Sequence, residues 1–265
     1  MLREALKNEL EKRMGFELEG RLLYLCHVGS VTHGTQMTEE EYGTRSDEDL
    51  FGVVLPPLER VVGLHPWKET TVIQVGDTDL TVHSLGKYVR LLLKGNLSML
   101  ETLWTPEEFV LQRDWMFKRL QLNRDIFSSK RAYSAFAGYA RQQIHKMNTS
   151  SEAMATGRLG AKRKALVEKN GFDTKNGAHL LRLLGMGIEF LSTGCLQVDR
   201  RGIDADLLKD VKAGRWTKER VLEHAESMFG AAKIAEQASQ LPDRPNEDGA
   251  EEMLLKFYRV HWNIS

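Results

Sequence analysis

The stretch from His27 to Pro57 constrains the fold more than any other part of the chain. Two apolar runs, Arg21–Val28 and Leu50–Leu55, have the length of buried strands. Gly29 ends the first run where the chain must turn, and a Pro-Pro pair ends the second. The pattern therefore predicts two strands of a sheet with a polar loop between them.

Two aspartates, Asp47 and Asp49, stand at the start of the second predicted strand, with Glu48 between them. Because successive side chains on a strand point to opposite faces, we expect the aspartates on one side and Glu48 on the other. Two carboxylates this close repel each other unless a cation lies between them, and hard divalent ions with oxygen ligands suit that position. The spacing predicts a Mg²⁺ or Mn²⁺ site.

Gly29 and Ser30 supply the second part of the predicted site. Without a Cβ at Gly29 the backbone can approach a phosphate, and the amide and hydroxyl that follow can donate hydrogen bonds to it. A metal held by two carboxylates keeps positions for water and phosphate oxygens. Taken alone, each fragment is more often an ordinary loop or strand end; together they favour phosphoryl or nucleotidyl transfer from an NTP.

A third acidic ligand is expected on a strand beside the first pair. Two further strands are predicted over Thr70–Val75 and Leu80–His83, around a turn at Gly76 and Asp77. An aspartate in such a turn bonds its own backbone, which explains Asp77 without any function. Asp79 stands at the start of the later strand, and we therefore prefer it to Asp77 as the third acid.

Lys87 and Lys94 follow on a helix that Ser84 is placed to cap. The two lysines are seven residues apart, about two turns, and so fall on roughly the same face. One or both are candidates to reach triphosphate oxygens from the Asp79 end. The alternative is that both are solvated helix lysines.

Beyond Pro106 the composition changes from strands to helices. The predicted helices there are Gln112–Leu122, Lys130–Met147, Gly177–Thr193, Asp204–Ala213, Thr217–Leu241 and Asp248–Trp262. The basic, small-residue segment 148–175 is either a loop that orders on an anionic substrate or a linker running into a charged helix. His179 and Arg182 share a helix face, where a lone histidine is most often a satisfied core residue.

The order of strand, Gly-Ser, Gly34, SDxD, strand and Pro-Pro resembles the DNA polymerase β-like nucleotidyltransferase superfamily. The segment Asp79–Asn96, read as DLTVHSLGKYVRLLLKGN, is similar to that of its RNA-ligase-associated branch. The fold class we expect is α+β. A nucleotidyltransferase domain over 1–105, with a small mixed sheet and flanking helices, would precede an all-helical substrate-binding or nucleotide-binding domain over 106–265, with the active site between them.

The resemblance implies roles for the acids. Asp47, Asp49 and Asp79 would hold two metal ions that bridge the nucleophile and the leaving pyrophosphate, and Asp79 would be the general base. It also raises the chance that the His179 helix faces the nucleotide. The full set of predicted nucleotide ligands is Gly29, Ser30, Lys87, Lys94, His179 and Arg182.

The implied reaction moves an NMP from an NTP to an acceptor hydroxyl or phosphate, with RNA-end modification or repair as the favoured setting. Lysine plus arginine equals aspartate plus glutamate at 37 each, so there is no basic excess for tight nonspecific nucleic-acid binding. This balance slightly favours the alternative of a small-molecule or protein acceptor. A non-catalytic nucleotide-binding module is the third possibility.

The acidic insert Met37–Thr44 is either a flap or surface padding, and we favour padding because its glutamates would repel a triphosphate.

Only two cysteines are present, Cys26 and Cys195, which makes the reducing cytoplasm the expected location. No stretch is apolar for long enough to span a membrane, so no membrane partner is expected, and the oligomeric state is left open.

Overall fold

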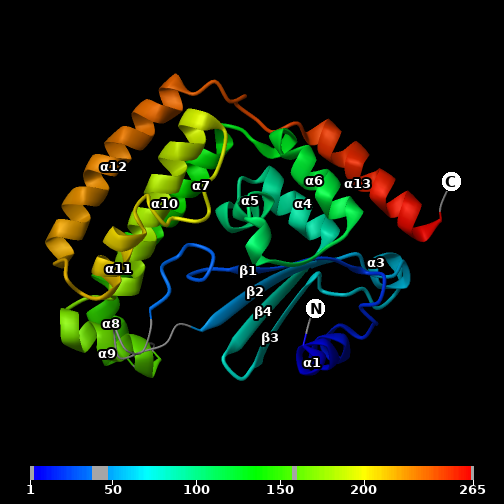
Figure 1. Ribbon diagram of the computed structural model, residues 1–265, viewed down its shortest axis with the longest axis horizontal. Helices are drawn as coiled ribbons and strands as arrows, with labels where there is room; N and C mark the ends of the chain where they lie inside the picture. Colours follow the sequence, from blue (N-terminus) through cyan, green and yellow to red (C-terminus); the bar gives the residue numbers. More distant parts are fainter. Residues whose placement is uncertain (1–2, 38–46, 157–159, 264–265) are drawn as a thin grey trace. The chain divides into compact units, whose positions relative to one another are not determined.

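The computed structural model describes residues 3–37, 47–156 and 160–263, and it has an α+β fold (Figure 1). The chain folds into two compact units. Unit 1 comprises the described residues of 1–33, 46–128 and 245–265, and unit 2 those of 34–45 and 129–244.

Unit 1 contains a small mixed sheet, as predicted. Its strands are β1 (Leu22–Val28), β2 (Glu48–Val54), β3 (Thr70–Val75), β4 (Thr78–Ser84) and β5 (Val110–Arg113). They lie in the order β3-β4-β2-β1-β5. β2 and β4 are parallel, whereas the other neighbouring pairs are antiparallel. The parallel pairing of β2 with β4 places each residue of β2 opposite one residue of β4.

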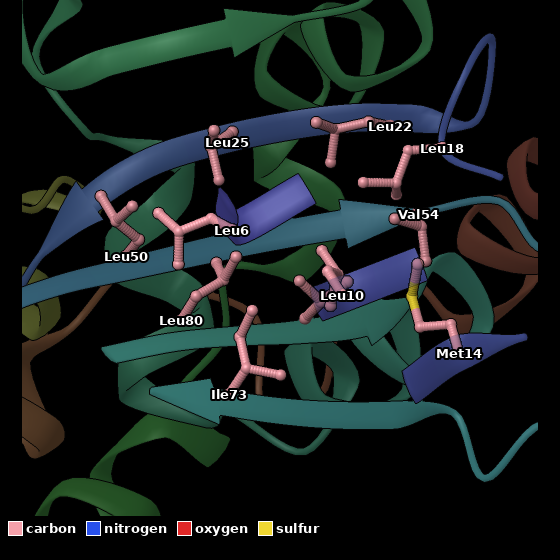
Figure 2. Packing of buried hydrophobic residues seen from close by; sticks show 11 residues of the cluster. Leu6, Leu10, Met14, Leu18, Leu22, Leu25, Leu50, Val54, Ile73 and Leu80 are labelled. Atoms are coloured by element: carbon pink, nitrogen blue, oxygen red, sulfur yellow. The ribbon is translucent and has the colours of Figure 1, made fainter. Parts of the chain in front are cut away.

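One face of this sheet is covered by α1 (Glu4–Met14). The side chains of Leu6, Leu10 and Met14 are buried against the sheet, where they join a cluster that includes Leu50 and Leu80 (Figure 2). Each such buried side chain contributes roughly 1.5–3 kcal/mol of hydrophobic free energy. The four-residue spacing of the apolar positions, which places them on one helix face, explains why α1 packs here.

The other face carries three helices that follow the strands in the chain (Figure 1). They are α4 (Leu85–Leu93), α5 (Leu97–Leu103) and α6 (Trp115–Leu122). Ser84 caps α4 by accepting a hydrogen bond from the Lys87 amide, and Asn96 caps α5 in the same way through Met99. An aromatic layer ties the helices to the sheet, with the rings of Tyr24 and Phe117 stacked 3.7 Å apart.

A later helix, α13 (Glu247–Trp262), also belongs to unit 1. It packs against α4, and the Gly86 amide donates a hydrogen bond of 3.1 Å to the Tyr258 hydroxyl. Three short helical segments complete this unit: α3 (Glu59–Val62) and the 3₁₀ helices η1 (Glu107–Phe109) and η2 (Arg124–Phe127).

Unit 2 is helical in its described residues. It contains α7 (Arg131–Asn148), α8 (Ser150–Ala155), α9 (Ala161–Asn170), α10 (Thr174–Thr193), α11 (Ala205–Lys212) and α12 (Lys218–Ala238). Helix α10 is the centre of this unit because it packs against α7, α11 and α12. Its apolar side chains, among them Leu180 and Leu184, form the core with Leu208 and Val221.

One prediction about the second half needs correction. Gln112 and Arg113, predicted to start a helix, belong to strand β5 beside β1, and α6 begins only at Trp115, after the capping residue Asp114. In segment 148–175, α8 and α9 occupy most of the described residues, with Gly171 ending α9 at a positive φ. Residues 38–44 of the acidic insert lie outside the described part.

Strand β5 and helices α6 and α13 belong to the same compact unit as the rest of the sheet. The division at residues 105 and 106, which was based on the change from strands to helices, stays a prediction about functional domains. In the part of the chain that the structure describes, no helix is long and apolar enough to cross a membrane.

His83 on β4 generates a prediction about stability. Its Nδ1 lies 3.0 Å from the Thr70 hydroxyl, and burial, together with the nearby charge of Lys87, lowers the pKa of His83 to about 4. Below pH 6.5 the unfolded chain binds a proton that the folded chain does not, so stability should fall as the pH drops from 6.5 towards 4, by at most about 3 kcal/mol.

The measurement is urea unfolding at pH 7.5 and 4.5. His83→Gln should lose less stability between the two values than the unsubstituted chain. His145→Gln, which changes an exposed histidine on α7, is the matched control and should keep the original pH dependence. Equal losses in both variants would show that His83 does not carry the effect.

Candidate active site

The two acids Asp49 and Asp79 are brought together by the central parallel strands. In the register between β2 and β4, Asp49 stands directly opposite Asp79. Residues paired in this way point to the same face of a sheet, on strands about 4.8 Å apart. Leu50 and Leu80, the next residues along, point into the core under α1, so the two aspartates lie on the opposite face.

Glu48 points away from this face, as the alternation predicts. Its carboxylate lies on the α1 side of the sheet, where it accepts a 2.6 Å hydrogen bond from the Thr78 hydroxyl and pairs with the Arg3 guanidinium at 3.1 Å. Asp47 lies one residue before β2. Glu48 therefore has a structural role, and the acids available for chemistry are the aspartates.

Gly29 lies beside the Asp49 carboxylate. The neighbouring residue Val28 pairs with Asp49 across β1 and β2, and Gly29 itself has a φ of 70°. A Cβ at this position would come within 2.7 Å of Asp49 Oδ2. Only glycine satisfies both the backbone conformation and this approach, so the structure brings the Gly29 turn and Asp49 together.

Ser30 opens a tight turn after β1. The Gly29 carbonyl accepts hydrogen bonds from the His33 amide at 3.1 Å and from the Thr32 hydroxyl at 3.0 Å. This arrangement holds the segment after Gly29 in a single helical turn, and Ser30 is its first residue. Ser30 is therefore the residue next to the glycine that lies against Asp49.

A buried pair that the sequence analysis missed anchors this turn. His33 Nε2 lies 2.9 Å from Glu101 Oε2, and both side chains are buried. Glu101 belongs to α5, so the bond ties the Gly29 turn to that helix. A usable signal was present in the sequence: Glu101 is the one charged residue in an otherwise apolar or small helix, LSMLETL. Buried charges of this kind need a partner.

The lysines are not brought to the acids as a pair. Lys87 Nζ donates to the Thr70 hydroxyl, next to His83, and His83 lies four residues, about 13 Å, along β4 from Asp79. Lys94 is exposed at the end of α4, roughly 10 Å along the helix axis from Lys87. The structure therefore does not place Lys87 beside Asp79, and any contact of either lysine with a triphosphate stays a prediction.

His179 and Arg182 lie in unit 2, on α10. His179 is exposed, contrary to its interpretation as a core histidine, whereas Arg182 is buried and its Nη1 lies 3.1 Å from the Met186 sulfur. The two side chains thus occupy different environments although they are three residues apart. Their role as nucleotide ligands stays a prediction.

The two candidates for the third acid lie in different surroundings. Asp77 is exposed in the turn after Gly76, where its carbonyl accepts a 3.0 Å hydrogen bond from the Glu48 amide. Asp79 is half-buried in the sheet opposite Asp49. Among the described residues, no group of three or more His, Cys, Asp or Glu side chains is arranged to hold a metal ion, so the three-acid metal site stays a prediction.

A small mixed sheet, a glycine-serine turn and an acid pair on its central strands describe the polymerase β-like nucleotidyltransferase fold. The profile of the RNA repair pathway DNA polymerase beta family, RlaP, matches residues 2–243. The chain belongs to this family, which confirms the resemblance seen in the sequence. Family membership also makes the chain a nucleotidyltransferase in general terms.

Similarity to individual known proteins is slight. No curated protein matches the chain. Among solved structures, a nucleotidyltransferase-like protein from Exiguobacterium sibiricum matches with a TM-score of 0.30 and 9% identity, over 97% of this chain and 79% of its own. That similarity is too low to support any conclusion about this chain.

The contact between Gly29 and Asp49 generates a prediction. Gly29→Ala should destabilise the chain by about 1–2 kcal/mol through its left-handed backbone and, in addition, displace the Asp49 carboxylate. Gly20→Ala is the matched control, since Gly20 has a φ of 67° and nothing lies within 4 Å of an added Cβ. Urea unfolding should show the larger loss at Gly29.

A double-mutant cycle separates strain from crowding. Asp49→Ala should relieve part of the loss in the Gly29→Ala background, with a coupling of about 0.5–3 kcal/mol, and should have no coupling with Gly20→Ala. Equal losses at both glycines with no coupling would contradict the close approach of Asp49 to Gly29.

Proposed function

We propose that the chain is a Mg²⁺-dependent nucleotidyltransferase that transfers an NMP from an NTP to the end of an RNA and releases pyrophosphate. The observation that carries the proposal is the register that sets Asp49 opposite Asp79, with Gly29 against Asp49. Family membership supports nucleotidyl transfer, and the family's description as part of RNA repair supports RNA as the acceptor.

The donor set suits a hard divalent ion. Asp49 and Asp79 offer carboxylates from adjacent strands on one face of the sheet, and Asp47 would complete the ligands. When bound, such an ion neutralises phosphate charge and aligns the triphosphate with the acceptor. The amide and hydroxyl of Ser30, in the turn that follows Gly29, would donate hydrogen bonds to phosphate oxygens.

The proposed transfer forms one bond and breaks one. The acceptor hydroxyl oxygen bonds to the α-phosphorus of the NTP, while the bond from that phosphorus to the bridging oxygen breaks and its electron pair leaves with pyrophosphate. Asp79 would accept the proton of the hydroxyl. Most of the rate enhancement would come from alignment and charge, because this reaction asks little covalent chemistry of the protein.

A cytoplasmic location is part of the proposal. Both cysteines are free thiols. Cys26 is buried in β1, and burial raises its pKa to about 12, so it stays protonated and unreactive. Cys195 is exposed in unit 2. Free thiols are typical of a reducing compartment.

Substitution of the acids tests the function. Asp49→Asn and Asp79→Asn should each lower NMP incorporation from a labelled NTP by at least about 100-fold, because each removes a charge aimed at the phosphates. Asp77→Asn, at the exposed turn two residues from Asp79, is the matched control and should stay within about twofold. Thermal unfolding of each variant should confirm that the chains remain folded.

Three further arms identify the metal and the acceptor. Removal of Mg²⁺ with EDTA should abolish incorporation, and Mg²⁺ should restore it. Label should appear in RNA when RNA, DNA, protein and small hydroxylated compounds are offered in parallel.

Full turnover by Asp49→Asn would refute the assignment of the acids. Label found only in a protein or small molecule would support the other acceptor class, to which the balanced charge of the chain is also suited.

A further inference from the structure

A second site lies in unit 1, on the helix-covered side of the sheet. It is a pocket of about 410 Å³ between the end of α5, strand β5, helix α6 and η2. The residues that carry its chemistry are Leu103, Trp104, Arg113, Lys118, Leu122 and Arg124. We call it the Trp104 pocket.

The Trp104 pocket combines an aromatic wall with apolar and cationic neighbours. Trp104 is half-buried, and the Arg124 guanidinium lies 5.0 Å from the centre of its ring. Leu122, which also lines the pocket, is 72% exposed. A large apolar side chain left in solvent beside an aromatic ring forms a surface on which a flat ring can stack.

The charges at the rim are mainly positive. Arg113, Lys118 and Arg124 line the pocket together with one acid, Asp125. Arg113 is already held by Glu107 at 2.8 Å and by the Gln121 side chain at 3.1 Å. Within the described residues no ion pair involves Lys118 or Arg124. Arg124 lies against the Trp104 ring instead, so no carboxylate neutralises either charge before a phosphate binds.

The pocket and the acid pair lie on the same face of the sheet. On β1, Tyr24 pairs with Arg113 of β5, and Val28 pairs with Asp49 of β2. Tyr24 and Val28 are four residues apart and point to one face, which separates the two sites by about 13 Å along the strand. Helix α5 also connects the two sites. Glu101, about one helical turn before Trp104, is hydrogen-bonded to His33 in the turn that follows Gly29.

We propose that the Trp104 pocket binds a nucleobase and its adjoining phosphate in the single-stranded RNA acceptor, upstream of the end that is extended. This inference rests on the proposed function. Stacking of bases on aromatic side chains, with phosphates held by arginine and lysine, is how single strands are bound without a duplex. The base of the NTP has the same chemistry, but its triphosphate is expected at Gly29 and Asp49, so we assign the pocket to the acceptor.

The first test measures binding without catalysis. The full-length chain is titrated into a fluorescently labelled eight-nucleotide RNA in EDTA, without NTP, and anisotropy is recorded. Trp104→Leu should raise Kd about 5- to 150-fold, the range expected for one lost base stack. Lys118→Gln should also weaken binding and reduce the slope of log K against log salt by about 0.7.

Arg119→Gln is the matched control. Arg119 adjoins Lys118 on α6 and is also exposed, but it does not line the pocket. This variant removes the same charge and should leave Kd within about twofold and the salt slope unchanged. Equal weakening by Lys118→Gln and Arg119→Gln would overturn the pocket in favour of general attraction. Thermal unfolding shows whether Trp104→Leu is folded. If it is not, Kd of Lys118→Gln and Arg124→Gln for the RNA decides whether the pocket binds it.

Competition identifies the occupant. Unlabelled single-stranded RNA should displace the probe, whereas ATP and duplex RNA should not. Displacement of the probe by ATP would assign the pocket to the NTP and overturn the proposal. Equal affinity for single-stranded DNA would overturn the choice of RNA.

The two proposals fail separately. RNA binding that depends on Trp104, in a chain that transfers no NMP under any condition, would refute the proposed function and keep the pocket. Transfer of NMP to RNA with Kd unchanged by Trp104→Leu, Lys118→Gln and Arg124→Gln would refute the pocket and keep the function.

Discussion

The parallel hydrogen-bond ladder between β2 and β4 is the constraint on which the candidate site depends. It sets Asp49 opposite Asp79 and, one step along, Leu50 opposite Leu80. A slip of one residue would turn every side chain of one strand to the wrong face, moving its leucine to the face of the acids and burying its aspartate under α1. The hydrophobic core on one side of the sheet therefore protects the arrangement of the acids on the other.

Much of this arrangement could be predicted because its signals are local. The strand ends, the turn at Gly76 and the capping residue Ser84 each follow from a few neighbouring side chains. The preference for Asp79 over Asp77 came from the same kind of reasoning, and the structure sets Asp79 in the sheet and Asp77 in the turn. These features depend on the backbone within a few residues, which is the range that sequence patterns cover.

Features that depend on distant partners could not be predicted. Strand β5 has only four residues, and its identity as a strand comes from pairing with β1. The bond between His33 and Glu101 joins residues 68 positions apart. Lys87 has the spacing of a phosphate ligand, but the fold gives it Thr70 as a partner. In each case tertiary contacts decide the outcome, and a periodicity or a motif contains no information about them.

Helix α13 joins the sheet unit although residues 129–244 of the other unit separate it from the rest. The hydrogen bond from Gly86 to Tyr258 fastens it to α4. During translation the strands leave the ribosome first, then residues 129–244 of the second unit, and only afterwards the helix that packs against α4. The surface of α4 that α13 covers is therefore open for the time needed to synthesise more than a hundred residues, and transiently exposed apolar surface of this kind promotes aggregation of a nascent chain.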